Sequence, residues 1–186
     1  MHKPIKTAPY VYPLPVAILL TYNADGTPNA MTAAWAVPVD SDILAVCLSP
    51  EHKTNANFHR DPHVTVSFAT KSTMAEAAYF GTCSGNDVPN KVAATSLHDL
   101  KLAASPVMEE FPVAILCLFD HEDESTGMNY FKIEKVLADE KTLDENGRVD
   151  LVEAEAIVYD SFHRAYREVG KELGDAYSMG EKFVNE

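Results

Sequence analysis

The chain has 186 residues, a formal net charge of −13, 46% hydrophobic residues and 23% charged residues. This length fits one domain of about 100–200 residues, which can bury roughly 70% of its unfolded surface without a disulfide or a metal. The 15 basic residues are scattered among 28 acidic ones, whereas a nucleic-acid-binding surface needs clustered basic residues, so we expect no nucleic-acid partner.

Apolar runs and cysteines set expectations for location. The runs Pro15 to Leu20 and Pro112 to Phe119 are much shorter than the roughly 20 residues of a membrane-spanning helix. The N-terminus has no apolar core or cleavage site of a signal peptide. The three cysteines show no C-x-x-C spacing, which indicates reduced thiols. We therefore expect a cytoplasmic protein without membrane contact.

The first two-thirds of the chain predict mainly strands. The turn Asp25-Gly26 between the first two expected strands is a hairpin signal. Alternating apolar and polar residues, the pattern of a half-buried strand, mark two others. In chain order the expected strands are Val16 to Tyr22, Pro28 to Ala36, Ile43 to Leu48, Val64 to Phe68, Val113 to Phe119, Tyr130 to Leu137 and Val152 to Val158.

Three helices interrupt or follow these strands. Residues 53–59 predict a short helix that ends before Pro62, and Thr73-Met74-Ala75-Glu76 predicts a capping box for a helix to about Phe80. Apolar residues at helical spacing predict a C-terminal helix over about 160–175, capped by Asp160 or Ser161. Six or more strands with few crossover helices predict a mainly β protein, an antiparallel barrel with peripheral helices.

Phosphate-binding glycine motifs are missing. The eight glycines form neither G-x-G-x-x-G nor G-x-x-x-x-G-K-[ST]. A Rossmann dinucleotide domain and a P-loop are therefore not expected.

The segment "SPEHKTNANF" lies where a strand turns into a helix. The first amides of a helix lack intrahelical partners and, with the helix dipole, favour an anion. Lys53 and Thr54 fall near the helix start and Asn57 lies one turn on, so these side chains and Ser49 could bind a phosphate monoester. The alternative is that Thr54 or Ser49 only caps the helix and that Lys53 and Asn57 are solvated.

Two further segments could complete a site. "NAMTAAW" has small residues that let a flat ligand approach the strand backbone, and Asn29 and Thr32 add polar groups. The alternative is a barrel strand whose small residues face a crowded core around Trp35. "FGTCSGNDVPNK" ends in Lys91 and is either part of the site or a solvated loop.

In this order the segments resemble the flavin reductase-like proteins, the flavoredoxin group of the FMN-binding split-barrel fold. The matching pieces are "NAMTAAW", "CLSPEHKTNANF", "VTVSFATKSTMAEAAYFGTCSGNDVPNK" and "FPVAILCLF", within about Pro15 to Leu137, and a looser match to the tail "YREVGKELGDAYSMGEKF". The resemblance implies an antiparallel Greek-key split β-barrel, a single domain over residues 1–186, and a cytoplasmic homodimer that binds one FMN per subunit near the dimer interface.

The resemblance also implies a set of flavin contacts. Ser49, Lys53, Thr54 and Asn57 would bind the phosphate and ribityl chain. Met31, Lys91 and the aromatic Trp35 would lie near the isoalloxazine ring together with Asn29 and Thr32, and Tyr166 would be a flavin neighbour. Asn129 stands where relatives often have the His of Gly-Asp-His, and unlike His it cannot titrate near neutral pH.

The sequence is compatible with three functions. The first is an FMN-dependent oxidoreductase that passes electrons from NAD(P)H to a small-molecule or protein partner, without a protein nucleophile or an essential acid–base residue. The second is an FMN-binding electron-transfer protein reduced by another protein. The third is a split-barrel relative that binds haem or another flat ligand, or a purely structural dimer. We expect no metal site, because His52, His59 and His63 lack a shared helical face, and we expect Cys83 to be an inert thiol.

Overall fold

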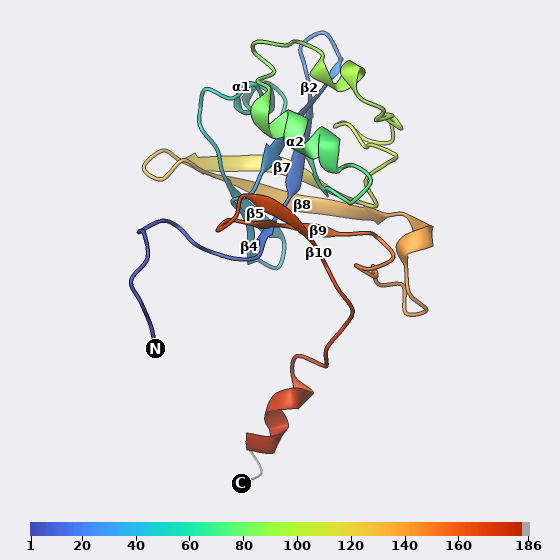
Figure 1. The fold of residues 1–186 in the computed structure, drawn as a ribbon. Helices are drawn as coiled ribbons and strands as arrows, with labels where there is room; N and C mark the ends of the chain where they lie inside the picture. The colour runs from blue at the N-terminus through green and yellow to red at the C-terminus, as the bar shows by residue number, and fades with distance from the viewer. Residues whose placement is uncertain (184–186) are drawn as a thin grey trace.

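The computed structural model describes residues 1–183, and most of its strands form one curled antiparallel sheet (Figure 1). The strand order in this seven-stranded sheet is β3-β2-β6-β7-β8-β5-β4. Its strands are β2 (Ala17–Tyr22), β3 (Pro28–Ala33), β4 (Ala36–Asp40), β5 (Ile43–Cys47), β6 (His63–Phe68), β7 (Val113–Asp123) and β8 (Met128–Ala138). The mainly β, antiparallel architecture expected from the sequence is thus confirmed.

Both faces of the central strands are buried. Along β2, Ile18 and Leu20 pack into one apolar cluster with Phe80 of helix α2 (Met74–Thr82), and Ala17 and Leu19 pack into a second cluster with Phe58 of helix α1 (Lys53–Arg60). A strand covered on both sides needs a continuous apolar run instead of alternation. This explains the uninterrupted apolar segment at the start of β2.

Two short helices, α1 (Lys53–Arg60) and α2 (Met74–Thr82), lie near each other at one end of the sheet (Figure 1). The helix expected over residues 53–59 is confirmed. The helix after Thr73 is also present, but the capping box is not: the Thr73 side chain makes no cap hydrogen bond and its Oγ1 accepts from the amide of Thr70 at 2.9 Å. Further 3₁₀ helices cover Lys91–Ala94, Glu140–Thr142 and Ser178–Phe183.

The helix expected over about 160–175 is wrong. The chain instead forms a small sheet of order β1-β9-β10, with β1 (Leu14–Pro15), β9 (Ile157–Asp160) and β10 (Ala165–Glu168). The cross-strand pair Tyr166 and Tyr159 stabilises this hairpin, as aromatic pairs do in antiparallel sheets. Gly170 and Gly174 lie inside the expected helix, where each costs about 1 kcal/mol relative to Ala.

Two strand boundaries also differ from the sequence prediction. The strand expected over Val152 to Val158 begins only at Ile157, because residues 151–155 form turns organised by the carboxylate of Asp150. The strand expected to reach Ala36 ends at Ala33, and β4 follows after a bend. Pro38 lies within β4, which is at the sheet edge, where a missing N–H is tolerated.

Residues 170–183 extend away from the sheet (Figure 1). Leu173 and Tyr177 in this segment are more than 85% exposed, at 90% and 92%. Within residues 1–183, none of the helices has the length and apolar character needed to cross a bilayer.

Candidate functional site

A polar network joins β2, β3 and α1 beneath the predicted anion site. Asn29 Nδ2 donates to Thr54 Oγ1 at 2.9 Å, and Asn57 Nδ2 donates to Thr21 Oγ1 at 3.0 Å and to Asn23 Oδ1 at 3.0 Å. Asn29, Thr54 and Asn57 are all buried. Thr54 Oγ1 accepts a hydrogen bond here, so its own hydroxyl proton remains available to a ligand. The network therefore fixes Thr54 at the start of α1 as a donor.

The N-terminus of α1 carries no side-chain cap. His52 is the N-cap residue, its side chain makes no cap hydrogen bond, and no acidic residue lies in the first turn. Its Nδ1 is buried without a hydrogen-bond partner among the described residues. Lys53 is the first helical residue, so its charge adds to unpaired amides and the positive end of the helix dipole. The alternative in which Ser49 or Thr54 merely caps this helix is not what the structure shows.

The C-terminus of α2 forms the opposite wall. Lys91 is buried, and its Nζ donates to the carbonyl of Phe80 at 3.3 Å and to the carbonyl of Cys83. Nζ also lies 5.6 Å from the centre of the Phe80 ring. Burial lowers the pKa of Lys91. Lys91 thus satisfies the last carbonyls of α2, a role that the sequence did not reveal.

Two glycines let the end of α2 and the loop after it approach strand β3 and helix α1. A Cβ on Gly85 would lie 2.5 Å from Asn29 Oδ1 and 3.2 Å from Cβ of Lys53. A Cβ on Gly81 would lie 3.5 Å from Cβ of Thr32, whose Oγ1 donates to the carbonyl of Ala77 at 2.6 Å. At Gly85 only the missing side chain permits this packing.

These groups enclose a cavity of about 180 Å³, called here the polar cavity. Its lining includes six residues predicted from the sequence, namely Asn29, Met31, Thr32, Lys53, Thr54 and Lys91. Sequence reasoning did not assign the other lining residues to the site: His52, Phe80, Gly81, Thr82, Cys83, Ser84 and Gly85. Most of these belong to the glycine-bearing loop noted above, so a signal was present, but the loop alone could not show which atoms it faces.

The other predicted residues lie outside the polar cavity. Asn57 does not line the cavity. Its Nδ2 donates to Thr21 Oγ1 in the polar network beneath the cavity. Ser49 is exposed, and its Oγ accepts from the amide of Glu51 at 3.4 Å. Asn129 is fully buried in β8, where its Nδ2 donates to the carbonyl of Gly127 at 3.2 Å and its Oδ1 has no partner among the described residues.

Trp35 and Tyr166 line neighbouring hollows. Trp35 is 55% exposed and lines a groove with the N-terminal arm. Tyr166 lines a second hollow, the tyrosine pocket, formed by Pro15, Val16, Thr32, Ala34, Ala78, Gly81, Thr82, Tyr159 and Tyr166. The tyrosine pocket shares Thr32, Gly81 and Thr82 with the polar cavity. Tyr166 is therefore next to the polar cavity, on a strand and not on the predicted helix.

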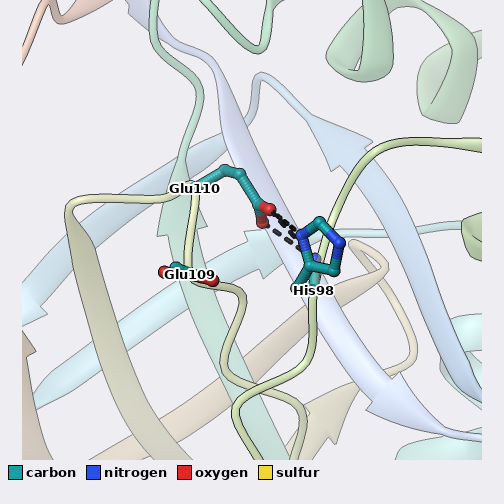
Figure 2. Close-up of side chains that lie close together, drawn as sticks. All are labelled: His98, Glu109 and Glu110. Carbon is teal, nitrogen blue, oxygen red and sulfur yellow. Dashed lines mark hydrogen bonds and ion pairs between the residues drawn. The ribbon is translucent and has the colours of Figure 1, made fainter.

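Two of the three histidines that were weighed as metal ligands have separate partners. His59 Nδ1 contacts the carbonyl of Asn55 at 3.0 Å, and His63 Nδ1 contacts Asp61 Oδ1 at 2.6 Å. One other group in the described part of the chain, His98 with Glu109 and Glu110, has potential ligand atoms within 4.8 Å of one another. Figure 2 shows the Glu110 carboxylate turned toward His98, where it accepts from the ring at 2.6 Å and from the backbone amide at 2.9 Å. Hydrogen bonding within this loop accounts for the cluster.

Comparisons with known proteins show the family to which this fold belongs. The model of the flavin reductase like domain matches residues 10–159. Flavoredoxin of Desulfovibrio vulgaris (Miyazaki F) superposes with a TM-score of 0.90 at 29% identity, covering 97% of this chain and 100% of that chain. A search of curated proteins gave no significant match.

Two more distant solved structures share the fold. Flavoredoxin from Methanosarcina acetivorans has a TM-score of 0.84 at 22% identity, covering 98% of this chain and 100% of that one. Nitrilotriacetate monooxygenase component B from Bacillus cereus has a TM-score of 0.72 at 14% identity, covering 94% and 100%. Since the family model spans most of the sequence, the chain belongs to the flavin reductase-like family of split-barrel proteins.

Proposed function

We propose that the polar cavity binds the phosphate end of FMN and that the protein is a cytoplasmic FMN-dependent oxidoreductase. The observation that carries this proposal is the uncapped start of α1, where His52, Lys53 and Thr54 line one cavity. Each hydrogen bond to a charged group contributes about 1.5–3 kcal/mol, so a few of them can retain a phosphate dianion in a protein of net charge −13. The residues present therefore fit the phosphate group.

The rest of FMN requires a less polar surface beside the phosphate. Met31, Phe80 and Gly81 line the polar cavity, and β3 is the edge strand of the sheet, so its outer backbone groups have no strand partner. Such groups can bond a planar heterocycle while the apolar side chains exclude water. Bound FMN would supply hydride and electron transfer. The protein's part is to bind and orient the ring, and Lys91 would place a positive charge near it.

An electron-transfer protein without its own NAD(P)H activity is the second candidate. Flavoredoxin of Desulfovibrio vulgaris is the similar protein that motivates it. The exposed Asp120 and Glu124 at the β7–β8 turn could steer a basic partner. In both versions the flavin site is the same, and only the electron donor differs.

The two versions separate in one experiment. The protein is purified, reconstituted with FMN, and mixed anaerobically with NADH or NADPH while flavin absorbance is followed. Bleaching within seconds to minutes supports the oxidoreductase. Reduction by a protein donor but by neither nucleotide supports the electron carrier. A protein that takes up no FMN overturns both.

We also propose that the protein is a homodimer. Strand β4 is a sheet edge with Val37 and Val39 about half exposed, at 47% and 52%, and Trp35 just before it is 55% exposed. An exposed apolar edge of this kind is usually covered by another chain. The same partner would bury the apolar side chains of Leu173 and Tyr177 in the extended C-terminal segment.

A further inference from the structure

Two buried amide side chains, one on α1 and one on β8, each have a polar atom without a partner among the described residues. These atoms are Nδ2 of Asn55, a donor, and Oδ1 of Asn129, an acceptor. Asn55 is 6% exposed, and Asn129 is fully buried. Leaving a buried polar atom without a hydrogen bond is costly, so native proteins pair such atoms with protein groups or with ordered water. The two atoms are complementary, and each needs a partner.

The side chain of Asn129 lies on the face of β8 that α1 covers. Asn129 pairs with Glu122 across the β7–β8 ladder, and directly paired residues point to the same face of a sheet. Glu122 Oε2 lies 3.6 Å from Nε2 of His59 on α1. Phe131 is two residues after Asn129, hence on the same face, and its ring centre lies 5.3 Å from that of Phe58 on α1. The contacts on either side of Asn129 are therefore contacts with α1.

Asn55 lies on the matching face of α1. Residues three positions apart share one face of a helix, so Asn55 is on the face of Phe58, one turn nearer the helix start. The helix start is also at the Asn129 end of β8, because the amide of Leu48, shortly before α1, donates to the carbonyl of Gly127 at 3.0 Å. Asn129 Nδ2 donates to that same carbonyl. Both unpartnered atoms therefore belong to the interface between α1 and β8.

We propose that one buried water accepts a hydrogen bond from Asn55 Nδ2 and donates one to Asn129 Oδ1, and that this bridge positions the start of α1. Buried waters make about 2–4 hydrogen bonds to protein groups that otherwise lack partners. Lys53 and Thr54 directly precede Asn55 and line the polar cavity, so the bridge fixes where they lie. Neither asparagine lines the cavity, so both are positioning residues. The positioning of a phosphate rests on the proposed function, whereas the bridge itself does not.

A crystal structure of the FMN-free protein, at a resolution that places ordered waters, tests the bridge directly. We expect one water within hydrogen-bond distance of both Asn55 Nδ2 and Asn129 Oδ1. A direct hydrogen bond between the two amides, or side chains that point away from each other, would overturn the proposal.

Asn129→Leu removes the acceptor while it keeps the branching of the side chain, and it tests the positioning role. It should weaken FMN binding about tenfold and riboflavin binding less than about twofold, because only the phosphate depends on the start of α1. Asn146→Leu, at an exposed position outside both elements, is the matched control and should affect neither ligand. Equal losses for the two ligands in Asn129→Leu would show a merely structural role and refute the positioning.

The double variant Asn55→Leu/Asn129→Leu completes a double-mutant cycle. Removing either end breaks the same bridge, so the double variant should bind FMN about as weakly as each single variant. Losses that multiply to about 100-fold would contradict the bridge. The same cycle is run by urea denaturation of the FMN-free proteins, where the losses of stability should likewise not add. A wild type that holds the bridging water but binds no FMN would overturn the proposed function and leave the bridge standing.

Discussion

At the scale of single residues, Gly85 connects the loop after α2 to the predicted anion site. The position has no left-handed φ, so an Ala is not strained by its backbone, but its Cβ would lie 2.5 Å from Asn29 Oδ1. Real Cβ atoms do not approach another atom this closely, so Asn29 or the loop must move. This movement would change the shape of the polar cavity and leave the hydrophobic core unchanged.

Gly85→Ala should therefore weaken FMN binding about tenfold, while the free energy of unfolding changes by less than about 1 kcal/mol. Fluorescence quenching of FMN and urea denaturation measure the two quantities. Gly170→Ala is the matched control, because nothing lies within 4 Å of the Cβ that it would add. Unchanged FMN affinity in Gly85→Ala would show that the loop does not shape the site.

Lys91 illustrates a residue whose presence at the site was predicted but whose contacts were not. From the resemblance alone, Lys91 is expected to place its positive charge beside the flavin ring. In the structure the ammonium also donates to two carbonyls at the end of α2. These carbonyls come from residues 8 and 11 positions earlier, and one sequence offers no means to pair them.

Lys91→Met should lower the free energy of unfolding by about 1–3 kcal/mol, the cost of leaving buried polar groups unpaired. Lys135→Met, at an exposed position in β8, should change it by less than about 0.5 kcal/mol. Urea denaturation of the FMN-free proteins gives both values. Equal stabilities of the two variants would mean that Lys91 does not stabilise the end of α2.

At the scale of elements, sequence periodicity located most of the central strands, and local signals, namely Pro62 and the motif at Thr73, located helices α1 and α2. The prediction from periodicity was wrong after Asp160, where apolar residues at helical spacing lie in a β-hairpin. The Asp160 carboxylate accepts from the amides of Phe162 at 3.0 Å and His163 at 3.2 Å. A helix N-cap makes the same bonds two and three residues on, so the local pattern could not distinguish a cap from a hairpin turn. Only the pairing of β10 with β9 shows that the segment is a hairpin.

The same carboxylate gives the β9–β10 hairpin a defined pH dependence. Burial opposes ionisation of Asp160, but hydrogen bonds from His163 and Arg167 outweigh it and lower the pKa to about 2, from 3.8. Because the folded pKa is below the unfolded value, the stabilisation is complete above pH 3.8 and is lost as the pH falls through about 2.

The urea midpoint of the wild type should therefore exceed that of Asp160→Asn above pH 3.8, and the gap should narrow as the pH approaches 2. Asp87→Asn, at an exposed position outside this hairpin, controls for the change in net charge. A gap that is independent of pH would contradict the assigned hydrogen bonds.

At the scale of the whole molecule, the fold brings three distant segments to one edge of the sheet. β3, the start of α1 and the end of α2 surround the polar cavity, and the β9–β10 hairpin adds the tyrosine pocket. The first three segments were predicted from the sequence, and the family resemblance implied that they meet, whereas the hairpin region was predicted as a helix. Trp35 and Asn129 do not reach the polar cavity, because strand order sets which strand ends lie together and one sequence does not reveal that order.

The exposed edge strand β4 makes a prediction about assembly. Val37→Asp/Val39→Asp places charges on the proposed interface and should convert a dimer into a monomer, measured by sedimentation velocity. Val136→Asp, on an exposed position of β8, is the control and should remain dimeric. A wild-type monomer, or a dimer that tolerates both aspartates, would contradict the proposed homodimer.

The central claim is that the start of α1 binds the phosphate of FMN. Its most direct test is isothermal titration calorimetry with FMN and with riboflavin, which lacks the phosphate, on the wild type and on Lys53→Ala/Thr54→Ala. Loss of two charge-assisted hydrogen bonds should weaken FMN about 100-fold more than riboflavin, whereas the exposed control Lys135→Ala should affect neither ligand. Equal losses for FMN and riboflavin would contradict the account.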